Sequence, residues 1–593
     1  MIPLALKINS MKNTATFFSS LAIFLFSCFN ITAQETSKDT IKTEVVNVIT
    51  SYTPTISDAF KIKKRPNVKL GERLQKKKLQ YHIFSVPVAS TFVPKKGDAR
   101  ELDFDLQQQF AQNFISAGIG THARPNIEAF LHKNKGNNEF GFYTKFANTK
   151  GNLKNVLLSN DFSNFNLHGY YSQNNKNSIW KLAANYTRDS YNWYGLPNEI
   201  NFLPATISAI NEQQIYNGYD TQFSIQLKSS ALKSIDAQFQ HFSDTYKSKE
   251  IVFNINPTFE VPLRSLHKDL TDLTLKTSLH YLNGEYPQSY NSLVKNEYSF
   301  FTLGAVPNYF LSSNDLSIKL GTKLVYASDL ENKINQFFIY PDINISYPLF
   351  SRAATIYVAI DGGLHTNTNK EFATANPFIS PTQKMLQTNR MYSFKAGVKG
   401  KINDKTNVSF QVNYHNEEDK PLFAINNSKS DGITSTHLGF EYGNSFEVVY
   451  DDIKSLQFNG NLSVEIQNNL TLETNVTYNK YTLSTQEAAW NLPNFLTEIT
   501  IDYSINKWTV SGELYFVGER KGKSFAGSNP SSVTVKNLSS YTDFNVYGGY
   551  TINSHFTAYL KMNNLFNAKY QSINNFPSFG TQILGGITYS FDF

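Results

Sequence analysis

Residues Leu456–Asn479 read LQFNGNLSVEIQNNLTLETNVTYN, and apolar and polar side chains alternate through both halves of this stretch. The two alternating runs are separated only by the polar turn Gln467-Asn468-Asn469. A period of two residues sends successive side chains to opposite faces of a β-strand, so the stretch predicts two antiparallel strands joined by a tight turn. The same alternation recurs from about Asp103 onward and also ends the chain, from Ile583 to Phe593.

The composition restricts what such a sheet can be. The chain has 593 residues, of which 17% are charged and 14% aromatic, with one Cys and a mean hydropathy of −0.36. No uncharged apolar run reaches the ~18 residues that a membrane-spanning helix requires. One Cys excludes both a Cys-based metal site and an internal disulfide framework. Because a barrel strand shows lipid only its alternate residues, we predict an all-β, transmembrane antiparallel β-barrel of roughly 20–24 strands.

The connections between the predicted strands fall into two sizes. Asn403-Asp404-Lys405 and Asn553-Ser554 are short polar turns, whereas Thr366–Arg390, Gly518–Asn537 and Asn567–Thr581 are long. Outer-membrane barrels have short periplasmic turns and longer outside loops. Short and long connections alternate backward from the C-terminus, which predicts that the chain ends in the periplasm. A β-sandwich shows similar alternation, but the many aromatic residues favour a barrel.

The start of the chain has the pattern of an export signal. Lys12 is followed by the apolar run Phe17–Phe29 and then by the small-residue site Ile31-Thr32-Ala33. A positive residue, an apolar segment and a small-residue site form a secretory signal peptide. We therefore predict a signal peptide at residues 1–33, a basic periplasmic segment at 34–100 and an outer-membrane β-barrel at 101–593.

The segment 34–100 is strongly basic, with 14 Lys and Arg against 6 Asp and Glu. One interpretation is a solvated arm, and another is a basic surface for anionic lipid headgroups or an acidic partner. Nucleic acid is not an expected partner of an exported chain. Within the segment, residues 43–50 form a β-prone run whose centre is Glu44, Val45, Val46, Asn47 and Val48. Such a run can add a strand to the sheet edge of a partner, or it can pack on the rim of its own barrel.

The sequence contains no arrangement of residues that indicates catalysis. It has no HExxH, GxSxG, P-loop or EF-hand motif, and its 11 His residues lack metal-ligand spacing. We therefore predict a protein that is not an enzyme, with no catalytic residue, no cofactor and no metal site.

One segment near the end of the chain carries a resemblance to a known family. Asn563–Tyr570 reads NNLFNAKY and is followed by Pro577 and Gly580. It resembles the Asn-Leu-Phe segment near the end of the β-barrel in TonB-dependent outer-membrane receptors. The resemblance implies a barrel in the bacterial outer membrane that serves uptake. Glu44–Val48 looks like the TonB box of that family, which contacts an energy-transducing partner.

The last strand has a second recognisable pattern, which is typical of outer-membrane barrels in general. It implies lipid as the surrounding medium and recognition by the barrel-assembly machinery, through Gly586, Tyr589, Phe591 and Phe593. The sequence departs from the receptor family at its start, because only 67 residues separate Ala33 from Glu101 and they contain no recognisable plug motif. Two functions follow, of which uptake or transport across the outer membrane leads. The alternative is a plugless structural barrel that acts as a scaffold or subunit of an outer-membrane complex.

Export predicts that the mature protein begins at Gln34, because signal peptidase cleaves after the small residue that ends the site. N-terminal sequencing of the protein extracted from outer membranes tests this cleavage. A retained Phe17–Phe29 segment, or a lipid attached to Cys28, would contradict it.

Overall fold

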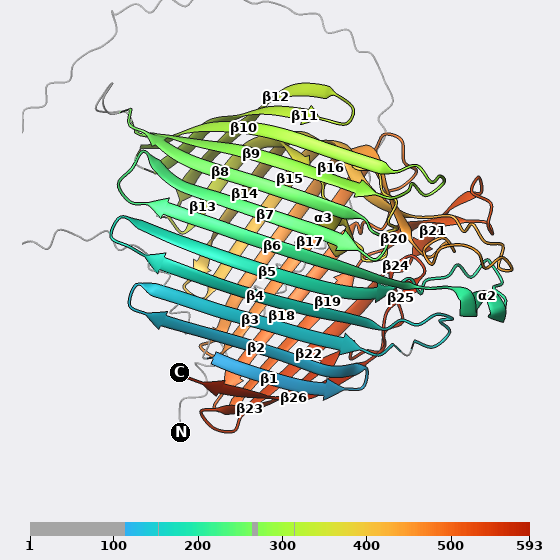
Figure 1. Ribbon diagram of the computed structural model, residues 1–593. Helices are drawn as coiled ribbons and strands as arrows, with labels where there is room; N and C mark the ends of the chain where they lie inside the picture. The colour runs from blue at the N-terminus through green and yellow to red at the C-terminus, as the bar shows by residue number, and fades with distance from the viewer. Residues whose placement is uncertain (1–112, 152, 264–270, 314, 351, 593) are drawn as a thin grey trace, which may run out of the picture. The chain divides into compact units, whose positions relative to one another are not determined.

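The computed structural model describes residues 113–592, apart from 152, 264–270, 314 and 351. The described residues belong to the second of two units of the chain, Ala99–Phe593. The predicted signal peptide and basic segment lie outside the described residues. In the second unit, one sheet of 22 antiparallel strands closes on itself, because β1 (Asn113–Gly120) pairs with both β2 (Ala123–Lys135) and β26 (Gln582–Phe591). Figure 1 shows the resulting barrel, and the predicted fold class and strand number are confirmed.

The remaining wall strands follow the chain order around the barrel. They are β3 (Asn138–Thr149), β4 (Phe162–Asn174), β5 (Ser178–Asn192), β6 (Gln213–Leu227), β7 (Leu232–Asp244), β8 (Lys249–Val261), β9 (Leu273–Tyr286), β10 (Asn296–Ser313), β11 (Leu316–Asp329), β12 (Ile334–Leu349), β13 (Ala354–Thr366), β14 (Gln387–Asn403), β15 (Thr406–Ile425), β16 (Phe446–Gln467), β17 (Leu470–Leu483), β18 (Phe495–Ile505), β19 (Trp508–Val517), β22 (Tyr541–Thr551) and β23 (Phe556–Asn563).

The other elements belong to the connections between wall strands. They are two small hairpins and two short helices: β20 (Arg520–Phe525) with β21 (Val533–Leu538), β24 (Gln571–Ile573) with β25 (Phe576–Pro577), α2 (Pro204–Ala209) and α3 (Asn369–Ala375). No helix among the described residues is long and apolar enough to cross a membrane.

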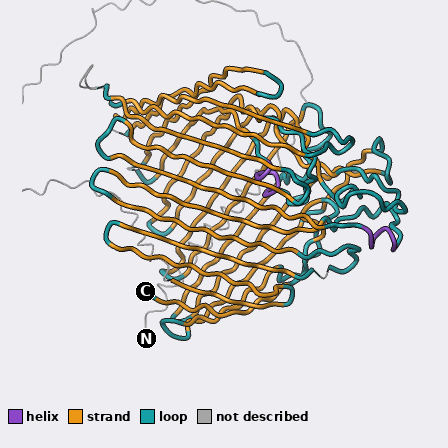
Figure 2. Tube along the Cα trace, in the orientation of Figure 1, coloured by secondary structure: helices purple, strands orange, loops and turns teal. Residues whose placement is uncertain are grey.

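Most of the long connections lie at one end of the barrel, as predicted. The β1–β2, β7–β8 and β11–β12 turns at that end are short, and the β8–β9 connection at the other end spans residues 262–272. Figure 2 shows the end with most of the short turns and, opposite it, the end with most of the long connections and both helices. We call the barrel opening at the long-connection end the mouth. Strand β26 ends at the short-turn end, so the last strand runs in the direction that the connection lengths predicted.

The alternation of side chains gives the barrel an apolar outside and a polar inside. Phe410, Leu560 and Ile587 stand on the outward face and are exposed. On the inward face, side-chain amides bond across neighbouring strands: the Asn413 amide donates to Gln457 at 2.8 Å, and the Gln457 amide donates to Asn479 at 2.9 Å. The inward and outward faces that alternation predicts for β16 and β17 are therefore the faces observed.

The barrel closes at a seam where small residues let an aromatic ring lie flat on the wall. A Cβ atom added to Gly586 would lie 2.4 Å from the Tyr559 hydroxyl oxygen and 2.5 Å from the carbonyl oxygen of Ala117. Next to this ring, the Thr588 hydroxyl donates a hydrogen bond to the Ser116 hydroxyl. The Ser116 hydroxyl in turn donates to the Tyr559 hydroxyl at 3.3 Å. Glycine at position 586 thus makes room for the Tyr559 ring across β23, β26 and β1.

Gly586→Val should block closure, because its side chain would overlap both the Tyr559 ring and the backbone of β1. Gly548→Val is the matched control on β22, since a Cβ atom there would meet nothing within 4 Å. The measurement is the fraction of heat-modifiable, folded barrel in outer membranes. We expect strong loss for Gly586→Val and near-normal levels for Gly548→Val; equal levels would contradict this account of the seam.

Candidate functional site

The mouth of the barrel is occupied by the connection between β13 and β14, residues 367–386, which we call the lid segment. Its helix α3 begins at a capping box: the Thr368 hydroxyl accepts from the backbone N–H of Glu371, and the Glu371 carboxylate accepts from the backbone N–H of Thr368. This reciprocal pair satisfies backbone donors that a helix start otherwise leaves free. The local sequence Thr-Asn-Lys-Glu therefore forms a short helix that the chain can place as a unit.

A wall carboxylate holds the start of this helix. Glu250 on β8 is buried, and it accepts from the backbone N–H of Asn369 at 2.7 Å and from the Tyr298 hydroxyl at 2.9 Å. A buried carboxylate is stable only when its oxygens are bonded, and here a free helix donor supplies one of the bonds. Glu250 therefore attaches the lid segment to the inner wall of the barrel.

The lid segment also bonds wall strands that are far apart around the barrel. The Tyr216 hydroxyl on β6 donates to the Pro377 carbonyl at 3.0 Å. The Asn296 amide at the start of β10 donates to the Thr382 carbonyl, and the backbone N–H of Val448 on β16 donates to the Gln383 side chain. Strands β6 and β16 are ten places apart in a sheet of 22 strands. A single connection that reaches both must lie across the mouth.

Phe576 on the last connection stands at the centre of an aromatic cluster in the mouth. Its side chain is 0% exposed, and its ring is stacked on that of Phe378 in the lid segment at 3.9 Å between centroids. Tyr194 packs edge-on against the same ring at 5.0 Å, and Phe446 lies at 5.8 Å. Buried rings in such arrangements add specific stabilisation to the burial of their area. The cluster joins three connections with the end of a wall strand.

A fourth connection, residues 426–445, completes the structure in the mouth. The Asn444 amide donates to the Trp193 carbonyl at 2.7 Å, and the Tyr290 hydroxyl donates to the Asn427 carbonyl. Burial raises the pKa of Tyr290 well above its ordinary value, and burial also raises the pKa of Tyr194. Both hydroxyls therefore remain neutral donors at physiological pH.

The inner wall beneath the lid segment is lined with neutral hydrogen-bonding groups. On β4 and β5 the Asn166 amide donates to Asn185 at 3.1 Å, and on β7 and β8 the Asn254 amide donates to Gln238 at 3.2 Å. A hollow of about 290 Å³ between this wall and Lys370 of α3 is lined by amide, imidazole and carboxylate groups. The lumen face in this region is therefore polar, and its amides lie beside a few charged groups such as Asp220 and Lys370.

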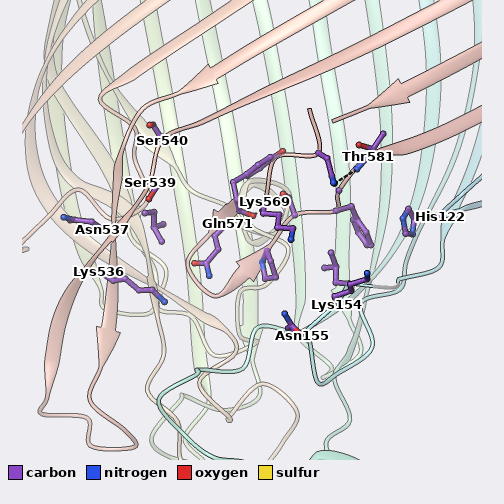
Figure 3. A pocket seen from close by; sticks show the side chains of 18 residues that line it. His122, Lys154, Asn155, Lys536, Asn537, Ser539, Ser540, Lys569, Gln571 and Thr581 are labelled. Carbon is purple, nitrogen blue, oxygen red and sulfur yellow. Dashed lines mark hydrogen bonds between the residues drawn. The ribbon is translucent and has the colours of Figure 1, made fainter. Parts of the chain in front are cut away.

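A larger cavity, of about 940 Å³, lies beside the aromatic cluster (Figure 3). It is lined by the β1–β2 turn, the β3–β4 connection, the end of β21 with the residues after it, and the last connection. Three lysines line it, each from a different connection: Lys154, Lys536 and Lys569. No Asp or Glu is among the 18 lining residues. The cavity is therefore electropositive.

Two of the polar side chains that line the cavity are bonded to neighbours. Lys536 donates to the Asn575 side chain at 3.1 Å, and the Tyr570 hydroxyl donates to the Asp543 carboxylate at 2.6 Å. Burial, followed by this bond to Asp543, raises the pKa of Tyr570. None of the ion pairs found within the described part of the chain includes Lys154, Lys536 or Lys569.

The residues singled out from the sequence are not brought together. Glu44, Val45, Val46, Asn47 and Val48 lie outside the described residues, as does Phe593. On β26, Gly586 faces inward under Tyr559, whereas Tyr589 stands on the outward face beside Phe556, with ring centroids 5.0 Å apart. Phe591 stacks on Tyr589 at 5.4 Å. Recognition of these residues by the assembly machinery remains a prediction.

The lid segment and the lysine cavity were not identified as a site from the sequence. Their connections were recognised as long, but length alone does not show that Thr366–Arg390 turns inward across the mouth. The one local signal was the capping box Thr368-Asn369-Lys370-Glu371 inside an otherwise irregular stretch. Across residues 113–592, as far as they are described, no group of three His, Cys, Asp or Glu is arranged to hold a metal ion.

Comparison with known proteins identifies relatives by structure alone. No protein-family model and no curated protein sequence matches the chain. The pyoverdine outer membrane receptor FpvA from Pseudomonas aeruginosa, bound to pyoverdine, matches with a TM-score of 0.59 at 12% identity, over 81% of this chain and 78% of that chain. The FrpB iron transporter from Neisseria meningitidis matches with a TM-score of 0.59 at 10% identity, over 81% of each chain.

A third solved structure, a mutant of the ferric enterobactin receptor PfeA from Pseudomonas aeruginosa in complex with enterobactin, matches with a TM-score of 0.57 at 12% identity, again over 81% of each chain. All three are similar to this chain across most of its length, and the agreement concerns the path of the backbone. The protein therefore has the 22-stranded barrel fold of outer-membrane receptors, which confirms the fold that its resemblance to TonB-dependent receptors implied.

Proposed function

We propose that this protein lies in the bacterial outer membrane and transports a solute through its barrel, with the lid segment as the gate at the mouth. The observation that carries the proposal is the placement of residues 367–386 across the mouth, bonded to β6, β8, β10 and β16. A wall of 22 strands encloses a lumen wide enough to need blocking. The fold shared with outer-membrane receptors and an iron transporter supports the same function.

The lumen wall suits passage of a hydrated solute. Side-chain amides such as Asn166, Gln238 and Asn459 both donate and accept hydrogen bonds, so they can replace water around a polar solute. A scaffold would not need such a wall behind a closed mouth. We also propose that no enzymatic activity accompanies transport, and that membrane lipid and the barrel-assembly machinery are partners of this protein.

We further propose that Glu44–Val48 contacts a periplasmic protein, either an energy-transducing partner or another component. The run is β-prone and lies close to the predicted mature N-terminus, as a segment that adds to a partner's sheet edge requires. Contact with an energy-transducing protein would couple opening of the lid segment to work done from the periplasmic side.

The gate can be tested with a thiol placed behind it. Gln222 on β6 faces the lumen, on the inner side of Tyr216, and the predicted mature chain contains no Cys. In Gln222→Cys cells we expect slow labelling by an external maleimide too large for general porins. The pair Phe378→Ala and Phe576→Ala removes the stacked rings and should speed the labelling severalfold, because two large side chains leave cavities in the mouth.

The matched control is Phe350→Ala with Phe566→Ala, two exposed rings outside the aromatic cluster. The control pair should leave labelling slow. Fast labelling of Gln222→Cys without any ring change would mean that the mouth is open, and it would contradict a gate formed by the lid segment. Equal acceleration by both pairs would contradict the role of the cluster.

The partner segment is tested by a photo-crosslinker at position 46 together with Val46→Pro. Proline removes a backbone N–H and fixes φ, so it should abolish crosslinking and uptake more strongly than Val46→Ala. A partner contact predicts unchanged thermal stability of the purified Val46→Pro protein. Crosslinks only within the chain, together with lower stability, would show that the run packs on its own barrel.

A further inference from the structure

The lysine cavity differs in charge from the rest of the mouth. Two other lysines of the mouth are paired with carboxylates: Lys429 pairs with Glu441, and Lys523 pairs with Glu447 at 2.9 Å. In the cavity, Lys154, Lys536 and Lys569 converge from three connections with no carboxylate among the lining residues (Figure 3). Three like charges that share one cavity repel one another, so the arrangement is stabilised when an anion enters.

The neutral groups of the cavity also suit an anion. Asn155, Ser539 and Ser540 line it beside the lysines and can donate hydrogen bonds to oxygen atoms. His122 lies next to Phe579, with ring centroids 5.5 Å apart, and both rings border the cavity. The nearby Asp543 carboxylate accepts a hydrogen bond from the Tyr570 hydroxyl and is not among the residues that line the cavity. Lysines and hydroxyl donors are the groups that bind phosphate and carboxylate oxygens in proteins.

We propose that this cavity is a binding site for a polyanion that carries several phosphate or carboxylate groups. Its volume of about 940 Å³ lies at the upper end of the range for small-molecule sites, so it admits a ligand larger than a single phosphate. The claim that the cavity is the outer recognition site of a gated transporter rests on the proposed function. The claim that the cavity binds an anion rests only on its volume and its charges.

The position of the cavity connects binding to the gate. The last connection lines the cavity with Lys569 and Phe579, and between them it places Phe576 against Phe378 of the lid segment. The Tyr194 hydroxyl also bonds the carbonyl of Pro577, which lines the cavity. An anion held by Lys569 therefore contacts the connection that supplies the central ring of the aromatic cluster.

Two sources can supply such an anion at a cell surface: a free solute, or the phosphorylated headgroup of a glycolipid. The experiment has one arm for each source. In the first, isothermal titration calorimetry measures binding of tripolyphosphate to the full-length protein in detergent. In the second, the protein is reconstituted in nanodiscs with or without lipid A, and retained lipid A is quantified by mass spectrometry.

The test variant is Lys154→Gln/Lys536→Gln/Lys569→Gln. Its control, Lys176→Gln/Lys247→Gln/Lys333→Gln, removes the same charge from three exposed lysines in short turns outside the cavity. Loss of charge-assisted hydrogen bonds should weaken binding at least about tenfold in the test variant. The control variant should bind like the unaltered protein. Neutral raffinose should not bind, and added salt should weaken binding of tripolyphosphate.

Binding in the first arm that depends on the three cavity lysines supports a free solute, and lysine-dependent binding in the second arm alone supports a lipid headgroup. No binding by the unaltered protein in either arm, or equal loss in both variants, overturns the proposal. If the triple variant does not yield heat-modifiable barrel, Lys569→Gln alone is compared with Lys247→Gln. Failure of the gate experiment with intact anion binding would overturn the proposed transport function and leave the site standing.

Discussion

Every other feature of this protein depends on the closure of its sheet. Within lipid no water can bond a free backbone N–H or carbonyl group, so a sheet that crosses a membrane must have no open edge. Here the first and last strands meet at a seam of glycines under Tyr559, and Ser116 and Thr588 bond across it. Closure of 22 strands then fixes the width of the lumen. The width in turn creates the need for a structure that blocks the mouth.

The connections between the wall strands block the mouth of the barrel. The lid segment stays across the mouth because its polar groups bond the wall at several points and its rings pack on Phe576. Buried donors and acceptors that lose their partners are costly, so this arrangement depends on four connections: residues 193–212, the lid segment, residues 426–445 and the last connection. The lid segment and the last connection therefore form one unit. The stacked rings of Phe378 and Phe576 are the contact through which the proposed anion site would act on the proposed gate.

The outward face, the lumen wall and the lysine cavity differ in charge and polarity. The outward face is apolar, the lumen wall is rich in amides, and the lysine cavity is electropositive. An anion attracted to the cavity would next meet a wall that offers many side-chain amides, together with charged side chains that include the ion pairs Lys319–Asp342 and Lys395–Asp361. Such a sequence of surfaces permits binding that is specific at the entrance and weak along the path, as transport through a pore demands.

The sequence by itself determined the barrel, because a period of two residues and a closed sheet leave no choice about which side chains face lipid. The faces of Leu456–Asn479, the sorting of most connections by length and the strand number within its range were all predictable from the sequence. The site was not, because Phe378, Phe446 and Phe576 are far apart in the chain and nothing local shows that they meet. Only the tertiary structure decided that Thr366–Arg390 turns inward, since that depends on Glu250 and Tyr216 reaching it from other strands. Long connections carry no periodic pattern, and their positions follow from contacts that exist only after the barrel has closed.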